Sequence, residues 1–106
     1  MNEFKVKITG VGKLWDVDFF LEKDPSKSIS FNYKAGRKEW FTEKFKYSGG
    51  DEFIYELVVM ARYGTKWSGQ ILIYKDGVEE EFLKWSSAKT GKNNESRRTK
   101  PTKKIP

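Results

Sequence analysis

The stretch that most constrains the fold runs from Trp67 to Trp85 and reads WSGQILIYKDGVEEEFLKW. Two runs of β-favouring residues, 70–75 and 78–85, flank the dipeptide Asp76-Gly77. Asp-Gly tolerates positive φ at both central positions of a type I′ turn, whose twist matches that of the strands it joins. The stretch therefore predicts a β-hairpin and makes the C-terminal half of the domain an antiparallel β structure.

A two-residue turn at Asp76-Gly77 also fixes the register of the hairpin. The pairs that it predicts are Ser68 with Trp85, Gln70 with Leu83, Leu72 with Glu81, and Gly69 with Lys84. Trp85 then shares a strand face with Glu79 and Glu81. Because that face is half polar, we expect the indole of Trp85 to be partly exposed.

The rest of residues 1–85 also has the pattern of short strands. Residues 4–9 and 14–22 alternate apolar and polar side chains, residues 29–33 alternate again, and residues 52–62 are apolar on both faces, as in a central strand. About seven short strands separated by turn signals are typical of a sandwich or a barrel. We predict an all-β fold, a single antiparallel β-sandwich domain over residues 1–85.

Residues 37–47 (RKEWFTEKFKY) fit two interpretations. Phe41, Phe45 and Tyr47 follow a period of two if Trp40 lies on the other face, whereas Trp40, Phe41, Lys44 and Phe45 fit a helical stripe about as well. We favour a strand because strands flank the segment on both sides. The alternative, a helix, would make the fold α+β.

After Trp85 the composition changes. Residues 86–106 hold one acidic residue, Glu95, whereas residues 1–85 hold fourteen basic and fourteen acidic residues. The seven basic residues of this segment are Lys89, Lys92, Arg97, Arg98, Lys100, Lys103 and Lys104. With Ile105 as its one large apolar side chain, the segment predicts a disordered basic tail, because it buries too little surface to offset the entropy of ordering.

The basic tail is the first candidate binding site. Its cations could neutralise phosphates of a nucleic acid, with log K falling by about 0.9 per phosphate contacted as log salt rises. They could also lie on an anionic membrane surface, a weaker hypothesis. The simplest alternative is a solubilising terminus without a partner, since residues 86–106 contain no aromatic side chain for base stacking.

Tryptophans form the second candidate site. Trp85 and Trp40 could present flat faces to sugar rings, as aromatic side chains do in carbohydrate-binding modules. The alternative is that the tryptophans belong to the core, which we expect for most of the four.

Composition excludes much chemistry, because the sequence contains neither cysteine nor histidine. Zinc sites, thiolate nucleophiles, histidine bases and the usual haem or copper sites all need these residues. The acidic pairs Glu79/Glu81 and Asp16/Asp18 have the alternation of a solvent-facing strand surface rather than of a catalytic or calcium site. We therefore predict no catalytic residue, no metal and no cofactor.

Sorting signals are also absent from the sequence as given. No run approaches the roughly 20 apolar residues of a membrane span, and the start, MNEFKV, lacks the layout of a secretory signal. A cytoplasmic location is the default expectation.

A family resemblance follows from several elements in this order: Gly10–Gly12, Asp16–Phe19, Trp40 with Phe45, and Ile71–Gly77. This order resembles the small immunoglobulin-like sandwich domains of the MmpS type found in bacterial envelope proteins. The resemblance implies a non-enzymatic accessory domain.

The sequence thus predicts a non-catalytic interaction module that binds a protein partner through a sheet face or a sheet edge. Two alternatives stay open: a nucleic-acid-associated protein that uses the basic tail, and a carbohydrate-binding module that uses Trp85 or Trp40.

Overall fold

The structure is a computed structural model that describes residues 2–34 and 38–106. It contains strands throughout and one 3₁₀ turn, η1 (Pro25–Lys27). The strands are β1 (Glu3–Gly10), β2 (Asp16–Leu21), β3 (Phe31–Tyr33), β4 (Glu39–Thr42), β5 (Phe45–Lys46), β6 (Glu52–Phe53), β7 (Tyr55–Met60), β8 (Lys66–Lys75), β9 (Val78–Lys89), β10 (Glu95–Arg98) and β11 (Lys103–Lys104).

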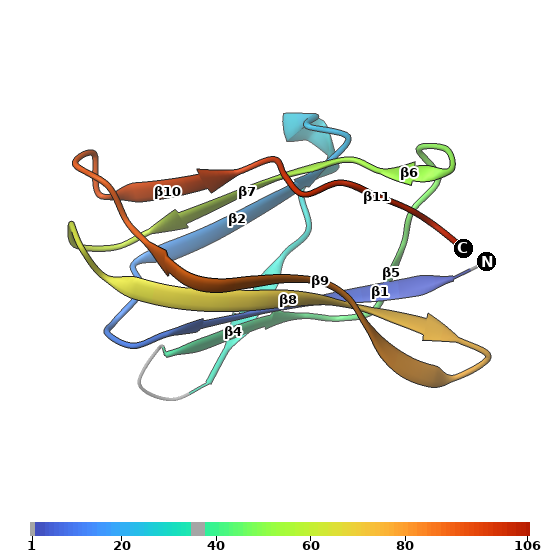
Figure 1. The fold of residues 1–106 in the computed structure, drawn as a ribbon, viewed down its shortest axis with the longest axis horizontal. Coiled ribbons are helices and arrows are strands. Elements are labelled where there is room, and N and C mark those ends of the chain that lie inside the picture. Colours follow the sequence, from blue (N-terminus) through green and yellow to red (C-terminus); the bar gives the residue numbers. More distant parts are fainter. Residues whose placement is uncertain (1, 35–37) are drawn as a thin grey trace.

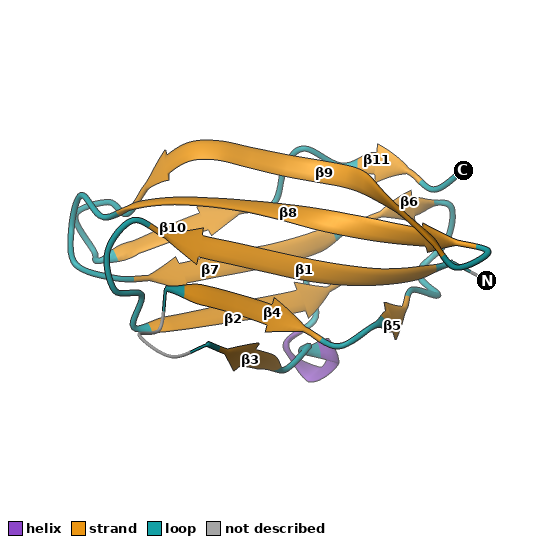
Figure 2. Cartoon of the chain, turned by 90° about the horizontal axis from the view of Figure 1, so that it is seen from below, coloured by secondary structure: helices purple, strands orange, loops and turns teal. Residues whose placement is uncertain are grey.

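Two antiparallel layers face each other, which confirms the predicted all-β sandwich (Figures 1 and 2). The larger layer, here called sheet A, has the order β3-β4-β1-β8-β9, with β5 also paired to β1. The smaller layer, sheet B, has the order β10-β7-β2, and the β11-β6 pair lies beyond it in the same layer. The apolar alternation of residues 4–9 puts Phe4, Val6 and Ile8 between the layers, each at most 1% exposed.

Aromatic rings in mutual contact run along the core from Phe4 to Trp67. The ring of Phe53 lies 4.8 Å from that of Phe4 and 5.6 Å from that of Phe82, measured between centroids. The stacked rings of Phe19 and Tyr55 lie 5.6 Å apart on neighbouring strands of sheet B. The dense aromatic content of the chain is thus mostly core, as expected for so small a domain.

The β8–β9 hairpin forms as predicted at its turn, where both Asp76 and Gly77 have positive φ (51° and 80°). Leu72 faces Glu81, as predicted, but the register then shifts by one residue. Ile71 faces Leu83 and Gly69 faces Trp85, so the pairs predicted for Ser68, Gly69 and Gln70 are wrong. The physical reason is a β-bulge at Phe82, which adds one residue to β9 and turns both Phe82 and Leu83 toward the core.

The segment that fitted both a strand and a helix is extended in its described part, residues 38–47, whereas residue 37 lies outside the described residues. It forms β4 and β5, which pair with consecutive parts of β1. Trp40 and Thr42 face the core, and Phe41 lies on the outer face. A break after β4 returns Phe45 to the interior, so no single alternation covers the whole segment.

The structure corrects the predicted disorder of residues 86–106. β9 continues past Trp85 to Lys89, β10 pairs with β7, and β11 pairs with β6. Figure 1 shows the part of this segment that follows β9, in orange and red, running through β10 and β11 in the layer that faces the one containing β9.

The segment orders without a large apolar surface because it supplies backbone groups to the body of the domain. The Tyr55 hydroxyl donates to the carbonyl oxygen of Pro101 (2.7 Å), and the Trp85 indole donates to that of Lys100 (3.2 Å). Backbone pairing along β10 adds to these bonds, and Ile105 packs on the core. Amino-acid composition indicates how much apolar side-chain surface a segment can bury, but not how many backbone hydrogen bonds it can form, so it underestimates the stability of this segment.

The buried phenol of Tyr55 predicts a loss of stability in alkali. Burial raises the pKa of Tyr55 above its ordinary value of 10.0. The phenol therefore stays protonated in the folded chain while that of the unfolded chain ionises, so the free energy of unfolding falls as the pH rises above about 10. Tyr55→Phe removes the hydrogen bond to the Pro101 carbonyl, so at neutral pH its free energy of unfolding should be about 1 kcal/mol lower than that of the wild type. Urea titrations across this range should show the two stability curves approaching each other above pH 10, and parallel curves would contradict the assignment.

Candidate functional site

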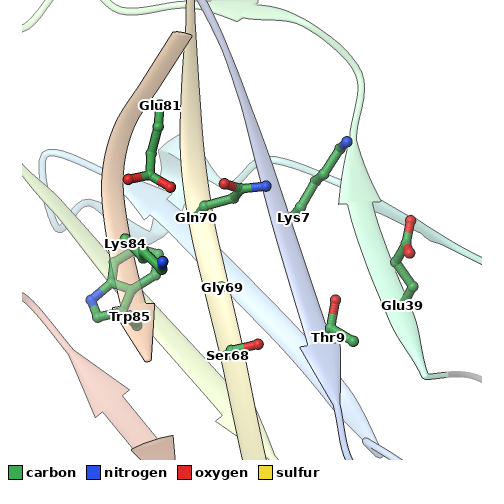
Figure 3. Close-up of a pocket in the computed structure, with 9 residues that line it drawn as sticks. All are labelled: Lys7, Thr9, Glu39, Ser68, Gly69, Gln70, Glu81, Lys84 and Trp85. Atoms are coloured by element: carbon green, nitrogen blue, oxygen red, sulfur yellow. The ribbon is translucent and has the colours of Figure 1, made fainter. Parts of the chain in front are cut away.

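The outer face of sheet A carries a depression of about 380 Å³ in which polar side chains gather (Figure 3). We call it the sheet depression. It is lined by Lys7, Thr9, Glu39, Ser68, Gly69, Gln70, Glu81, Lys84 and Trp85.

Strand register explains why these side chains meet. Because Val6 and Ile8 point inward, Lys7 and Thr9 on β1 point outward. Lys7 faces Gln70 and Thr9 faces Ser68 on β8. On the outer flanks, β4 places Glu39 opposite Thr9, and β9 places Lys84 opposite Gln70. Four strands thus contribute to one surface.

On the core side of the sheet, below the depression, side chains pack closely against the backbone of Gly69. A Cβ at this position would lie 2.5 Å from Ile8 Cδ1 and 3.3 Å from Trp85 Cε3. The missing side chain therefore lets Ile8 and Trp85 approach each other on the core side of the sheet.

The polar side chains at the centre of the sheet depression have no partner in the described part of the fold. Within the described residues, the side chains of Lys7, Gln70, Glu81 and Lys84 form neither an ion pair nor a hydrogen bond. Glu39, at the border, pairs with Lys34 at 3.3 Å. The centre thus presents two cations, a carboxylate and an amide to solvent, with no group of the described fold bound to them.

Some other outer-face side chains are paired within the fold. On the hairpin half of sheet A, the Tyr74 hydroxyl donates to Glu79 (2.5 Å), and Lys44 Nζ lies 4.4 Å from the Tyr74 ring centroid. On sheet B, Arg97 binds both Glu56 and Glu95. The four central side chains of the sheet depression differ from these pairs in having no partner within the described fold.

The acidic pairs lie on outer faces. Asp16 is exposed, and Asp18 is half-buried with its pKa raised by burial and by the neighbouring charge of Asp16. Glu79 and Glu81 are exposed. Among residues 2–34 and 38–106, no three acidic side chains come close enough together to hold a metal ion.

The two predicted aromatic binding residues are both buried. Trp85 and Trp40 are each 6% exposed, so neither presents a ring face to solvent. The expected exposure of Trp85 is wrong because the bulge at Phe82 reverses the alternation before Trp85 and turns it inward. Its ring lies 5.6 Å from that of Tyr55 and 6.3 Å from that of Trp67.

The predicted basic residues lie in several separate places. Arg98 and Lys100 line a second hollow of about 310 Å³ with Lys84 and Trp85, on the other side of β9. Arg97 is held in its ion pairs, and Lys103 Nζ lies 5.2 Å from the Phe82 ring centroid. The remaining three are Lys104, which follows Lys103 on β11, Lys89, which ends β9, and Lys92, which lies in the following loop. The seven cations do not form one continuous tail.

The candidate site therefore differs from the one expected. Sequence reasoning missed Lys7, Gln70 and Lys84, although the alternation of residues 4–9 already placed Lys7 on an outer face. The strand predicted at residues 14–22 is shorter in the structure, because β2 begins at Asp16 and leaves Trp15 in a loop, 49% exposed.

Comparison with known proteins returns no match to any family model, to any curated protein or to any solved structure. In the part of the chain that the structure describes, there is no helix with the length and apolar character needed to cross a membrane.

Proposed function

We propose that this chain is a non-catalytic interaction module that binds a protein partner at the sheet depression. The observation that supports the proposal is the set of unpaired polar side chains of both charge signs, held on the outer face of a six-stranded sheet. Lys7, Glu81 and Lys84 have no carboxylate or ammonium partner in the described fold, so a partner can satisfy them without breaking an existing ion pair.

A sheet face suits this role better than a sheet edge. The edge strand β9 departs twice from regular pairing, at Ile71/Leu72 and at Trp67/Gly69 of its partner β8. Bulges of this kind hinder the addition of a further strand. The C-terminal segment also runs beside β9, and the opposite edge strand, β3, has only three residues.

Charge composition favours a protein over a nucleic acid as the partner. Glu39 and Glu81 lie beside Lys7 and Lys84, and carboxylates repel a phosphate backbone. A protein segment with charges of both signs can match this arrangement. With Trp85 and Trp40 buried, the sheet depression presents no exposed tryptophan ring to a sugar.

Affinity capture tests the proposal with the full chain as bait. We expect Lys7→Glu/Lys84→Glu to lose the proteins that the wild type retains from a lysate of the source organism, with a drop of at least about tenfold, because two interface charges change sign. Lys23→Glu/Lys104→Glu is the matched control, since both lysines are exposed away from the sheet depression. The measurement is quantitative mass spectrometry of the retained proteins after nuclease treatment.

Equal retention by both variants would contradict the proposal, as would retention that disappears on nuclease treatment. Circular dichroism melts of the two variants should match that of the wild type, because all four lysines carry their charge on the surface.

A further inference from the structure

One end of the sandwich carries three exposed apolar side chains on neighbouring loops. This surface, here called the loop end, comprises residues 11–15, 61–66 and 89–94 and lies at the left of Figure 1. Val11 is 74% exposed, Tyr63 62% and Trp15 49%. Only two other large apolar side chains of the described chain, Tyr33 and Val78, are comparably exposed. Three of the five most exposed large apolar side chains thus lie on the loops of one end.

Hydrogen bonds hold these loops in place. The backbone N–H of Val11 donates to the Lys66 carbonyl (2.9 Å), and that of Trp15 to the Met60 carbonyl (2.7 Å). The N–H of Tyr63 donates to Asn94 Oδ1 (3.0 Å), which ties the second loop to the third. Between the exposed residues, Leu14 is fully buried and closes the end of the core. The three apolar side chains are therefore held outside the core.

The same surface is positively charged. Its five cations are Lys13, Arg62, Lys66, Lys89 and Lys92. None of them forms an ion pair with a carboxylate of the described chain. Lys66 and Lys89 even face each other across β8 and β9, an arrangement of like charges that destabilises a strand pair. An anionic partner bound at the loop end would reduce this repulsion between the two lysines.

We infer that the loop end docks on the surface of a lipid bilayer that contains anionic lipids. Val11, Trp15 and Tyr63 would enter the boundary between headgroups and acyl chains, where tryptophan and tyrosine are enriched. Lys13 and Arg62 line a hollow with Trp15, and these two cations would contact headgroup phosphates. Apolar insertion and electrostatic attraction together supply the two signals that stable peripheral binding needs.

Val11 favours a bilayer over a single-stranded nucleic acid. Bases bind through stacking on aromatic rings, to which an aliphatic side chain contributes little. Val11 is nevertheless the most exposed large apolar residue at the loop end. Hydrocarbon accommodates valine and aromatic rings alike, so a bilayer is the partner that uses all three exposed side chains.

Vesicle co-sedimentation of the full chain tests the inference. We expect binding to phosphatidylcholine vesicles that contain phosphatidylserine and much weaker binding to pure phosphatidylcholine. Lys66→Ser/Lys89→Ser should weaken binding about fivefold for each cation removed. Val11→Ser should weaken it by about tenfold through loss of the inserted apolar surface. Trp15 is the one exposed tryptophan of the described chain, so brominated acyl chains should quench its fluorescence, and Trp15→Phe should remove that quenching.

Matched controls lie at the opposite end of the sandwich. Val78→Ser makes the same substitution as Val11→Ser, at a valine that is 59% exposed at the hairpin tip. Lys46→Ser/Lys104→Ser removes two exposed cations at that end. Both controls should bind vesicles as the wild type does. Equal losses in controls and loop-end variants would overturn the inference, as would an absence of vesicle binding. Vesicle binding that is unaffected by Val11→Ser, together with tight binding of a single-stranded oligonucleotide, would also overturn it and assign the surface to nucleic acid.

Discussion

A chain that ends at Asn94 is expected to lose its cooperative unfolding transition. This truncation removes β10 and β11, which pair with β7 and β6. It also leaves the Tyr55 hydroxyl and the Trp85 indole without their carbonyl partners in residues 100–101. Each buried donor left unsatisfied costs about 1–3 kcal/mol.

Further losses add to these two. Ser96 is buried on β10, so its removal uncovers part of β7, the central strand of sheet B. Ile105 no longer packs on the core. Together these losses approach the total of about 5–15 kcal/mol by which small domains are stable. We therefore expect the truncated chain to be unfolded or aggregated.

Denaturant melts followed by circular dichroism check this prediction. The matched control is full-length Lys100→Ser/Lys104→Ser, which removes exposed charge but keeps the backbone of the segment. Its stability should stay within about 0.5 kcal/mol of the wild type. If the truncated chain melted like the wild type, residues 95–106 would be dispensable and their pairing with β6 and β7 would carry no stability.

Local patterns made the strands predictable. The alternation of residues 4–9 gave both the extent of β1 and its inward face, and the Asp76-Gly77 turn gave the hairpin that joins β8 to β9. The double-sided apolar run at 52–62 identified β7 as a central strand, which now lies between β2 and β10. In each case a few adjacent residues contain the signal, because the period of a strand is local.

The candidate site was harder to predict because it depends on long-range register. The bulge at Phe82 follows from packing, since it turns the Phe82 ring into the core, where the ring contacts those of Phe4 and Phe53. No residue type near Phe82 predicts this bulge, yet the bulge determines that the Trp85 side chain points toward the core. The order of residues 95–106 likewise depends on partners that lie about 40 residues earlier in the chain, a relation that composition does not report.

The two proposed surfaces are compatible with each other. The molecule measures 37 Å along its longest axis, and the loop end lies at one end of that axis (Figure 1). The strands of sheet A run along the same axis, so a molecule docked by its loop end would hold the sheet depression on its side, open to a partner at the membrane surface. This arrangement rests on both proposals.

Trp85→Ala is expected to lower the free energy of unfolding by about 3–5 kcal/mol, the usual cost of truncating a large buried aromatic residue. The ring fills the space between Tyr55, Trp67 and Gly69, and its N–H binds the C-terminal segment. Gly69 has no side chain that could move into the resulting cavity, so little relaxation can reduce the cost. Urea titration measures the change.

Trp15→Ala is the matched control, because it makes the same change at the half-exposed tryptophan of the loop end. We expect it to cost less than about 1 kcal/mol, since its indole makes few core contacts. Trp85→Phe should fall between the two, because it keeps most of the ring volume but leaves the Lys100 carbonyl without its donor. A cost below about 1 kcal/mol for Trp85→Ala, as expected for Trp15→Ala, would mean that Trp85 is not part of the core. Because Trp85 lines both the sheet depression and the hollow beyond β9, that result would restore it as a surface residue available to a ligand.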